Sequence, residues 1–448
     1  MNYFKLLWDL YSLKRNTVKT KEQIKNLQNK KLRKLLTHAY ENSKYYRRTF
    51  EEAGITREQI SKLPISAFPT IDKNILMEHF DDLVTDYDLK QNDIRRFDEE
   101  ETMDKKKFQN KYHVVHSSGS TGNPGYFVYN EEAWKQMLLG IIRAGFWNMS
   151  MFEILKLLLK KPRIAYIAAT GGRYGGAMAV SSGIEGVNAN QLFLDINTPL
   201  AEWIENIHKF KPNMIIGYPS AIKILGELVE KGEIQLNVFR VISCGEPLCP
   251  GLRNYMEKTF RADVVNIYGA SESLALGVET NHKEGMYLFD DMNYIEVEDG
   301  TMYLTSLYNF VQPLIRYRIS DQLKLKDRDK ESICPFTKVK NILGRNEDIL
   351  WFEDVKSGNR EFLHPLAIEG FCIEGMLDYQ FRKIDCNSFE MLIEISGEEN
   401  KNTIQLEMLK NMTEILHEKH LEYVKFYVRF VEQILPDPQT GKKRLIVK

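Results

Sequence analysis

The sequence predicts an α/β fold, with a large N-terminal region built on a parallel sheet and a small α+β region after it. Two observations predict this. Between residues 160 and 270, short apolar runs rich in β-branched residues alternate with helical stretches. Beyond residue 341, two strand-like runs flank the helical stretch NTIQLEMLKNMTEILHEKH. Strand–helix alternation of the first kind is typical of parallel sheets, which bind ligands at the carboxyl ends of their strands.

Four runs are the predicted strands of the parallel sheet, and each ends in glycine or other small residues: RIAYIAAT, PNMIIGYP, FRVISCGEP and DVVNIYGA. The stretches AEWIENIHKF and AIKILGELVEKG are predicted helices between them. Residues 20–60 are also predicted to be helical, because Leu32, Leu35 and Leu36 recur at helical spacing and Gly54 ends the run. Thr70 or Asp72 is expected to cap a further helix.

The composition excludes several classes of protein. The 448 residues are 43% hydrophobic and 27% charged with a net charge of -1, so we expect no nucleic-acid partner. The cysteines number five and form no CxxC pair, which indicates reduced thiols in a cytoplasmic protein without a structural zinc site. No apolar run is long enough to span a bilayer. The oligomeric state stays open between monomer and dimer.

The N-terminal stretch MNYFKLLWDLYSLKR lacks the apolar core and cleavage site of a signal peptide. We expect its aromatic and leucine side chains to pack on the body of the protein. The alternative is an amphipathic helix at a membrane surface, with Lys14, Arg15 and Lys19 nearby.

The stretch HSSGSTGNPG (116–125) concentrates short hydroxyl side chains and glycines. Such a loop can fold its N–H groups and hydroxyls around phosphate oxygens, although it is not a Walker loop. The predicted phosphate ligands are Ser117, Ser118, Gly119, Ser120, Thr121 and Gly122. An amidase-type serine hydrolase uses a similar stretch, but that alternative leaves the later motifs unexplained.

Four later motifs follow in order: YGASES (268–273), PLIRYRISD (313–321), ILGRNEDIL (342–350) and TGKKR (440–444). With the serine- and glycine-rich loop, this set resembles the adenylate-forming superfamily of acyl-CoA ligases, adenylation domains and luciferases. HAYENSKYYRRTFEEAGI, LPISAFPTIDK, GYPSAI and SCGEPL resemble the phenylacetate–CoA ligase branch and its CapK-like relatives.

The resemblance implies a two-step ligase. A carboxylic acid would react with Mg2+-ATP to give acyl-AMP and pyrophosphate, and the acyl group would then pass to the thiol of CoA or of a carrier protein. The alternative acceptor is an amine, in the synthesis of a cell-surface polysaccharide or a small metabolite. The resemblance also implies an N-terminal domain over residues 1–343 and a mobile lid over residues 344–448, with a hinge at 344–348.

The resemblance also assigns the nucleotide site. Gly245, Glu246 and Pro247 would line the adenine face, and Tyr268 would pack on the adenine ring. Asp321 would accept hydrogen bonds from the ribose. The remaining nucleotide contacts of the YGASES motif would come from Gly269, Ala270 and Ser271.

The same comparison implies three reacting groups. Glu272 would hold Mg2+, Arg345 would lie near the ribose and phosphates, and Lys442 would stabilise charge on the carboxylate and the α-phosphate. Without the resemblance, Lys442 would be a solvated tail charge, Glu272 a surface acid and Arg345 an ion-pair partner between domains. Lys443 is adjacent to Lys442, so the register of the lysine stays open.

The acid itself is not named by any motif. Gly217, Tyr218 and Gly172 are candidates for the acyl pocket, with Tyr218 as an aromatic wall. The sequence departs from the acyl-CoA ligase pattern at two places. The segment WFEDVKSGNREFLHPLAIEG is longer and more polar than the usual pantetheine loop, which keeps the amine acceptor open. In the phosphate loop, Gly125 stands where many relatives carry lysine.

Overall fold

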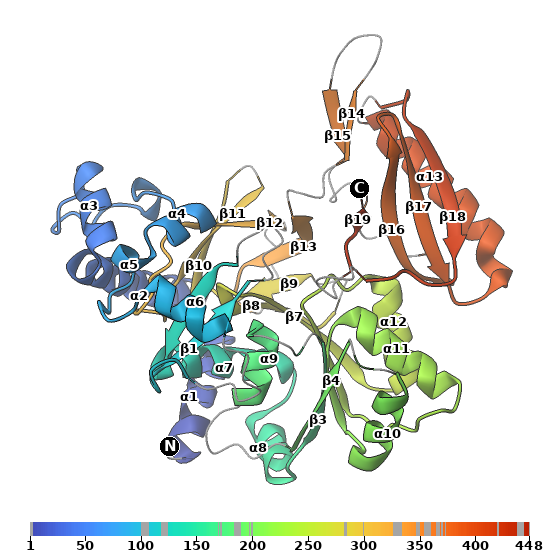
Figure 1. Cartoon of the computed structure of the whole chain (residues 1–448), viewed down its shortest axis with the longest axis horizontal. Coiled ribbons are helices and arrows are strands. Elements are labelled where there is room, and N and C mark those ends of the chain that lie inside the picture. Colours follow the sequence, from blue (N-terminus) through green and yellow to red (C-terminus); the bar gives the residue numbers. More distant parts are fainter. Residues whose placement is uncertain are drawn as a thin grey trace.

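The computed structural model describes the following residues: 3–99, 107–117, 124–168, 170, 173–182, 190–196, 198, 200–281, 285–298, 300–325, 334–345, 350–353, 360–363, 368, 371, 373–418, 421–436 and 443–447. Within them lies a large body at the left and bottom of Figure 1, from which a C-terminal part projects at the upper right.

The N-terminal helices are α1 (Tyr3–Asn16), α2 (Lys21–Asn42), α3 (Lys44–Glu52), α4 (Lys73–Glu78), α5 (Phe80–Leu83) and α6 (Gln91–Glu99), with the 3-10 turn η1 (Ile65–Ala67). Side-chain caps set several of their starts. Thr20 and Gln23 form a capping box on α2, and Ser43 accepts a hydrogen bond from an amide of α3. Asp72, not Thr70, caps α4.

Helix α1 meets the expectation for the N-terminus only in part. Leu10 and Leu13 are buried, and the Lys14 ammonium donates to the carbonyl oxygens of Phe146 and Trp147. Trp8 is 67% exposed, so the packing prediction is wrong for that side chain. Among the described residues, no helix is both long and apolar enough to cross a membrane.

In the described part of the chain, eleven strands form one mixed sheet in the order β10-β11-β12-β13-β9-β8-β7-β6-β5-β3-β4. The parallel strands are β3 (Arg163–Ala168), β4 (Asn190–Asp195), β5 (Met214–Gly217), β6 (Arg240–Cys244) and β7 (Asp263–Ala270). All four predicted strands are therefore present, together with β4. The antiparallel strands are β8 (Ser273–Glu279), β9 (Met286–Leu288), β10 (Asn293–Glu298), β11 (Thr301–Ser306), β12 (Tyr317–Leu325) and β13 (Lys338–Arg345).

Helices cover both faces of this sheet. One face packs against α10 (Leu200–Phe210), α11 (Pro219–Glu230) and α12 (Pro250–Phe260) through a shared apolar core. The other face packs against α7 (Glu131–Gly145), and α8 (Met151–Leu159) and α9 (Gly175–Ser182) complete the body. The hairpin of β1 (Tyr112–His116) and β2 (Tyr126–Asn130) has a separate core beside α5 and α6. This arrangement confirms the predicted α/β class.

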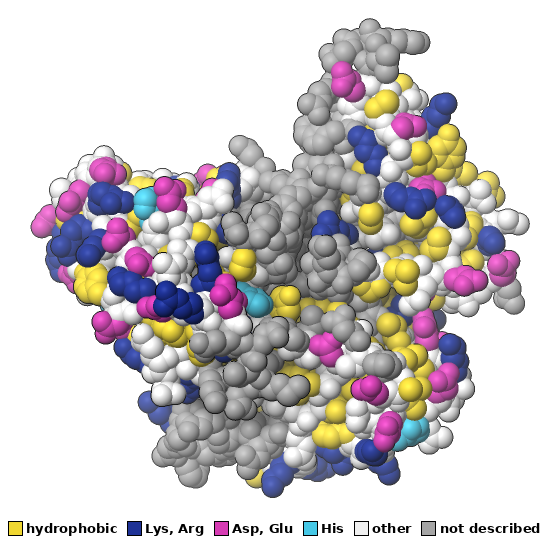
Figure 2. All heavy atoms as spheres, in the orientation of Figure 1, with side chains coloured by type: hydrophobic (Ala, Val, Ile, Leu, Met, Phe, Trp, Pro, Cys, Tyr) yellow, Lys and Arg dark blue, Asp and Glu magenta, His cyan; other side chains and the backbone are white. Residues whose placement is uncertain are grey.

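The C-terminal part has its own sheet, in the order β18-β17-β16-β19. These strands are β16 (Met376–Asp385), β17 (Ser388–Ile395), β18 (Lys425–Val431) and β19 (Ile446–Val447). Helix α13 (Lys401–Glu418) covers the sheet over an apolar core, preceded by the turn η4 (Glu398–Asn400), and β14 (Leu350–Glu353) pairs with β15 (Arg360–Leu363) nearby. On the face drawn in Figure 2, basic and acidic side chains are interspersed, as a net charge of -1 predicts.

Candidate active site

The predicted site residues gather at the carboxyl ends of the parallel strands. Gly217 is the last residue of β5, and Gly245 directly follows β6. Both positions require glycine. A β-carbon on Gly217 would lie 2.1 Å from the carbonyl oxygen of Ile167, and one on Gly245 would lie 2.7 Å from the Tyr218 ring. Gly245 also has a φ of +81°. The buried Tyr218 ring therefore packs directly against the backbone of the SCGEPL turn.

The YGASES motif spans the end of β7 and the turn into β8. The Tyr268 hydroxyl donates a 2.7 Å hydrogen bond to Asp321, the last residue of the PLIRYRISD motif. Burial, and then the Asp321 carboxylate, raise the pKa of Tyr268 far above its ordinary value, so the phenol stays a donor. Tyr268 itself is 8% exposed, and Ala270 pairs with Ser273 across the turn.

Glu272 lies in the same turn, next to tyrosine side chains. Burial raises the pKa of Tyr317, and the charge of Glu272 and a hydrogen bond to it raise that pKa further. The charge of Glu272 also contributes to the raised pKa values of Tyr129 and Tyr268. The carboxylate of Glu272 is therefore held at a position where two predicted motifs meet, by a hydrogen bond with Tyr317.

The ends of the serine- and glycine-rich loop approach one another and the YGASES turn. The amide of Ser117 donates to the carbonyl oxygen of Gly125 at 2.9 Å, and the amide of Gly125 donates to the Ser117 hydroxyl at 2.8 Å. The Ser271 hydroxyl donates to the carbonyl oxygen of His116 at 3.2 Å. The other predicted phosphate ligands, residues 118–122, lie outside the described residues.

A charged cluster beside this loop was not predicted. His116 Nδ1 lies 2.9 Å from the Asp98 carboxylate, and the Arg173 guanidinium lies 3.8 Å from the same carboxylate. Arg173 also stacks over the Phe97 ring at 3.9 Å. Arg173 directly follows Gly172, a candidate for the acyl pocket, but no feature of the sequence marked Arg173 itself. The only signal for His116 was its place directly before the first serine.

Parts of the PLIRYRISD and ILGRNEDIL motifs lie on adjacent strands of the large sheet, β12 and β13. Asp321 of β12 and Arg345 of β13 are register partners. The backbone of Arg345 is described, but its side chain lies outside the described residues, as do residues 346–349 of the predicted hinge. Lys442 and Gly172 also lie outside the described residues.

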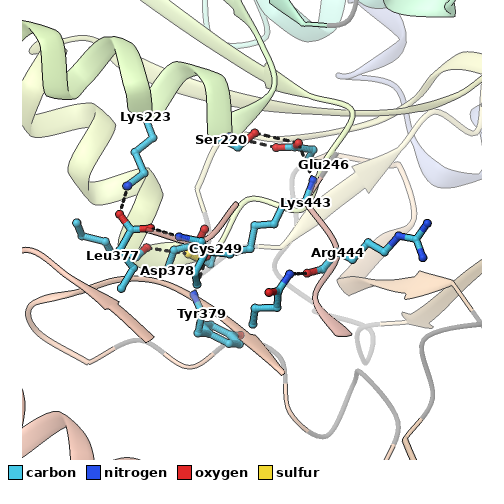
Figure 3. Close-up of polar contacts among 12 residues, drawn as sticks. Ser220, Lys223, Glu246, Cys249, Leu377, Asp378, Tyr379, Lys443 and Arg444 are labelled. Atoms are coloured by element: carbon cyan, nitrogen blue, oxygen red, sulfur yellow. Dashed lines mark hydrogen bonds and ion pairs between the residues drawn. The ribbon is translucent and has the colours of Figure 1, made fainter. Parts of the chain in front are cut away.

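The turn after β6 contacts the C-terminal part. The Glu246 carboxylate accepts hydrogen bonds from the amide and hydroxyl of Ser220, at 3.1 and 2.9 Å, and from the amide of Lys443 at 3.0 Å (Figure 3). Burial raises the pKa of Glu246, against these donors, which lower it. The Lys443 ammonium forms an ion pair with Asp378. Of the predicted adenine-lining residues, Glu246 thus directs its side chain to α11 and the C-terminal segment.

Histidine, cysteine and acidic side chains form no group of three suited to a metal ion within the described residues. The carboxylates of the site are Glu272 and Asp321 in the motifs and Asp98 beside the loop. A single carboxylate can bind a divalent cation that is also held by a polyanionic ligand.

Comparisons with known proteins agree with these motifs. No protein-family model matches the chain. Protein CapK of Staphylococcus aureus is 22% identical over 453 residues, covering 94% of this chain and 88% of CapK. Phenylacetate-coenzyme A ligase of Aromatoleum evansii is 25% identical over 377 residues, covering 78% of this chain and 75% of the ligase.

Solved structures share the fold. The 2-hydroxyisobutyryl-CoA ligase in its postadenylation state, in complex with 2-HIB-AMP, superposes with a TM-score of 0.70 at 20% identity, over 97% of this chain and 91% of the ligase. The thioesterification state of that ligase gives 0.57 over the same shares. The overall arrangement of this chain is thus closer to the postadenylation structure. Over most of its length the chain is thus similar in sequence to CapK and to a phenylacetate-coenzyme A ligase, and it shares the fold of the 2-hydroxyisobutyryl-CoA ligase.

Proposed function

We propose that the chain is an AMP-forming carboxylate ligase. A carboxylate attacks the α-phosphorus of ATP, which gives an acyl-adenylate and releases pyrophosphate. The acyl group then passes to an acceptor and AMP leaves. One observation carries this proposal: three motifs meet at one end of the strands of the large sheet. The Tyr268–Asp321 hydrogen bond joins two of them, and the Ser271–His116 hydrogen bond joins the third.

The nucleotide occupies the edge where these motifs meet. Residues 117–122 donate N–H and hydroxyl groups to the β- and γ-phosphates. Asp321, which the Tyr268 hydroxyl holds in place, accepts hydrogen bonds from the ribose hydroxyls. The turn 245–247 lines the adenine through its backbone, since the Glu246 side chain is engaged elsewhere.

The residues present fit a magnesium ion. Mg2+ prefers carboxylate and phosphate oxygens, and Glu272 presents a carboxylate in the turn that contacts His116, one residue before the phosphate loop. Glu272 would hold the ion there, which would neutralise part of the charge on the phosphates.

The positive charges that act on the reacting groups come from the C-terminal part of the chain. Lys442 stabilises negative charge on the carboxylate and the α-phosphate during attack, and Arg345 lies near the ribose and phosphates. Lys443 is the other candidate for the lysine, but its ammonium is engaged by Asp378, which favours Lys442.

The chain divides into a domain over residues 1–343 and a lid over residues 344–448 that rotates at 344–348 between the two half-reactions. Two features support this division. The residues from Leu350 onward have their own apolar core. Their sheet shares no strand with the large sheet.

The acceptor is a thiol, that of CoA or of a carrier protein. The names of the phenylacetate-coenzyme A ligase relatives support CoA. An amine is the second candidate, because a further relative, 28% identical over 165 residues, is an indoleacetate–lysine synthetase of Pseudomonas savastanoi.

ATP–pyrophosphate exchange tests the proposal. The purified chain is assayed with aryl, fatty, amino and uronic acids in the absence of CoA. We expect exchange with one class of acid, and the same acid is then offered with CoA or with amines. Absence of exchange for every acid, in a preparation shown to bind ATP, contradicts the proposal.

A further inference from the structure

A backbone hydrogen bond to a buried carboxylate of the large body holds the C-terminal segment, residues 443–447. The amide of Lys443 donates to Glu246 Oε1 at 3.0 Å, across 197 positions of sequence. Two other groups orient the same carboxylate, because the Ser220 hydroxyl donates to Oε1 and the Ser220 amide donates to Oε2. Ser220 lies in the first turn of α11, where the helix dipole favours a negative charge.

The Glu246 carboxylate is therefore preorganised to receive the segment. It is 8% exposed, and a buried carboxylate is stable only when donors surround it. Loss of the Lys443 amide would leave the Ser220 hydroxyl as the donor to Oε1. The C-terminal segment thus stabilises the ionised Glu246 carboxylate, and the carboxylate in turn holds the segment at a fixed place against the SCGEPL turn.

The Lys443 side chain reinforces this position from the other side. Its ammonium pairs with Asp378 of β16, a residue 4% exposed, and the Gln380 amide group of the same strand donates to the carbonyl oxygen of Arg444 at 2.9 Å. The segment is thus fixed to the sheet of the C-terminal part by side chains and to the large body by Glu246 (Figure 3).

A second contact joins the two parts one turn further along α11. Lys223 pairs with Glu394 of β17, and each side chain is 5% exposed. Glu394 also accepts a hydrogen bond from the amide of Ile434 at 3.1 Å, and Lys223 contacts Glu227 at 2.8 Å. Ser220 and Lys223 are three residues apart, so one face of α11 carries both contacts.

We propose that Glu246 is a positioning residue for the lysine of the first half-reaction, acting through the Lys443 amide, and that the Lys223–Glu394 pair holds the lid in the same arrangement. This inference rests on the proposed function, since it assigns the reacting lysine to Lys442. Glu246 touches neither the acid nor the phosphates. It fixes the backbone next to the lysine and so favours the adenylating arrangement over the transfer arrangement.

Opposite effects on the two half-reactions distinguish this role from a structural one. With Glu246→Gln the side-chain shape is kept, but the negative charge is removed and one oxygen becomes an NH2 group that faces a donor of Ser220 or Lys443, so the buried contact is weakened. We expect ATP–pyrophosphate exchange to fall at least about ten-fold, since hydrogen bonds to charged groups contribute about that factor or more. Transfer from a synthetic acyl-adenylate to the acceptor should be unchanged or faster. Lys223→Met should act in the same direction.

Two measurements accompany the kinetics. Calorimetric binding of ATP should fall less than exchange does, because the turn 245–247 lines the adenine through its backbone and the Glu246 side chain is directed to Ser220 and Lys443. Small-angle X-ray scattering, which requires no activity, should show the variant shifted away from the compact arrangement of the wild type. Glu390→Gln is the matched control, since Glu390 is also buried but pairs with Arg382 inside the C-terminal sheet. It should leave the ratio of the half-reactions unchanged.

Three results would overturn the inference: unchanged exchange in Glu246→Gln, an equal loss in both half-reactions, or a loss of ATP affinity that matches the loss of exchange. If the wild type itself exchanges with no acid, the proposed function fails separately. Scattering then decides the inference alone. A shifted curve for Glu246→Gln supports Glu246 as the group that holds the lid, and identical curves overturn it.

Discussion

The Tyr268 hydroxyl donates a 2.7 Å hydrogen bond to Asp321 and thereby joins two motifs that are 53 positions apart. The two residues lie on strands that are not neighbours in the sheet, because β8, β9 and β13 separate β7 from β12. The bond fixes the orientation of the Asp321 carboxylate, as a ribose-binding carboxylate requires.

Replacement of Asp321 tests its contact with the nucleotide. Asp321→Asn should raise the KM for ATP about ten-fold or more, because hydrogen bonds to a charged acceptor contribute about 1.5–3 kcal/mol. Tyr268→Phe removes only the orienting donor and should have a smaller effect on KM. The ATP dependence of pyrophosphate exchange measures both. An unchanged KM for Asp321→Asn would exclude the ribose role.

Replacement of the two adjacent lysines determines which one reacts. Lys442→Ala should reduce exchange about 100-fold, the scale of losing one charge-stabilising group in a preorganised site. Lys443→Ala loses the ion pair with Asp378 and should reduce exchange less. ATP binding by calorimetry should stay intact in both variants. A larger loss in Lys443→Ala than in Lys442→Ala would reverse the assignment.

Removal of the Glu272 charge should weaken magnesium binding. Glu272→Gln should raise the Mg2+ concentration needed for half-maximal exchange at least about ten-fold. Glu279→Gln is the control, since Glu279 is buried at the far end of β8, the strand that follows Glu272, and contacts Asn266 and Arg253. If both variants show the wild-type Mg2+ dependence, Glu272 is not the ligand.

The Arg143–Asp291 ion pair should dominate the stability of the N-terminal packing. Both side chains are 0% exposed, with contacts at 2.6 and 2.9 Å, and Asn16 of α1 donates to the same carboxylate. Arg143→Met leaves an unpaired buried charge and should lower the free energy of unfolding by about 3–5 kcal/mol. Lys209→Met breaks an exposed pair with Glu205 and should change it by less than about 0.5 kcal/mol. Urea unfolding measures both, and equal values would contradict the prediction.

Asp290 should make stability depend on pH. Burial raises the pKa of Asp290 to about 6, although the Thr337 amide bonded to it lowers that pKa. Since the folded pKa is raised, this group favours folding at low pH, and its contribution is lost as the pH rises from about 4 through about 6. The Asp290→Asn variant has no titrating group in this pH range, and its side-chain oxygen can still accept the hydrogen bond from the Thr337 amide.

The variant should therefore gain stability relative to the wild type between pH 4.5 and pH 8, by an amount on the order of 2 kcal/mol. Unfolding free energies of both proteins at the two pH values give this difference. A difference that does not change with pH would show that Asp290 is ionised equally in the folded and unfolded states.

The local sequence was sufficient to predict the parallel strands and to locate most of the motifs along the chain. Short β-branched runs ending in glycine predicted β3, β5, β6 and β7, because strand period and turn chemistry are local properties. It was not sufficient for the cluster of Asp98, His116 and Arg173, which comes from three separate segments. It was also not sufficient for the direction of the Glu246 side chain, which packing on α11 decides.

The sequence by itself determined the α/β class, the order of the motifs and the chemistry that those motifs resemble, since each depends on residue type and spacing over a few positions. Only the tertiary structure decided which motifs touch. Tyr268 contacts Asp321, and Glu246 receives the Lys443 amide, because sheet order and the docking of the C-terminal part bring distant backbone together. Contacts of that range depend on packing of the whole chain, and no local pattern encodes them.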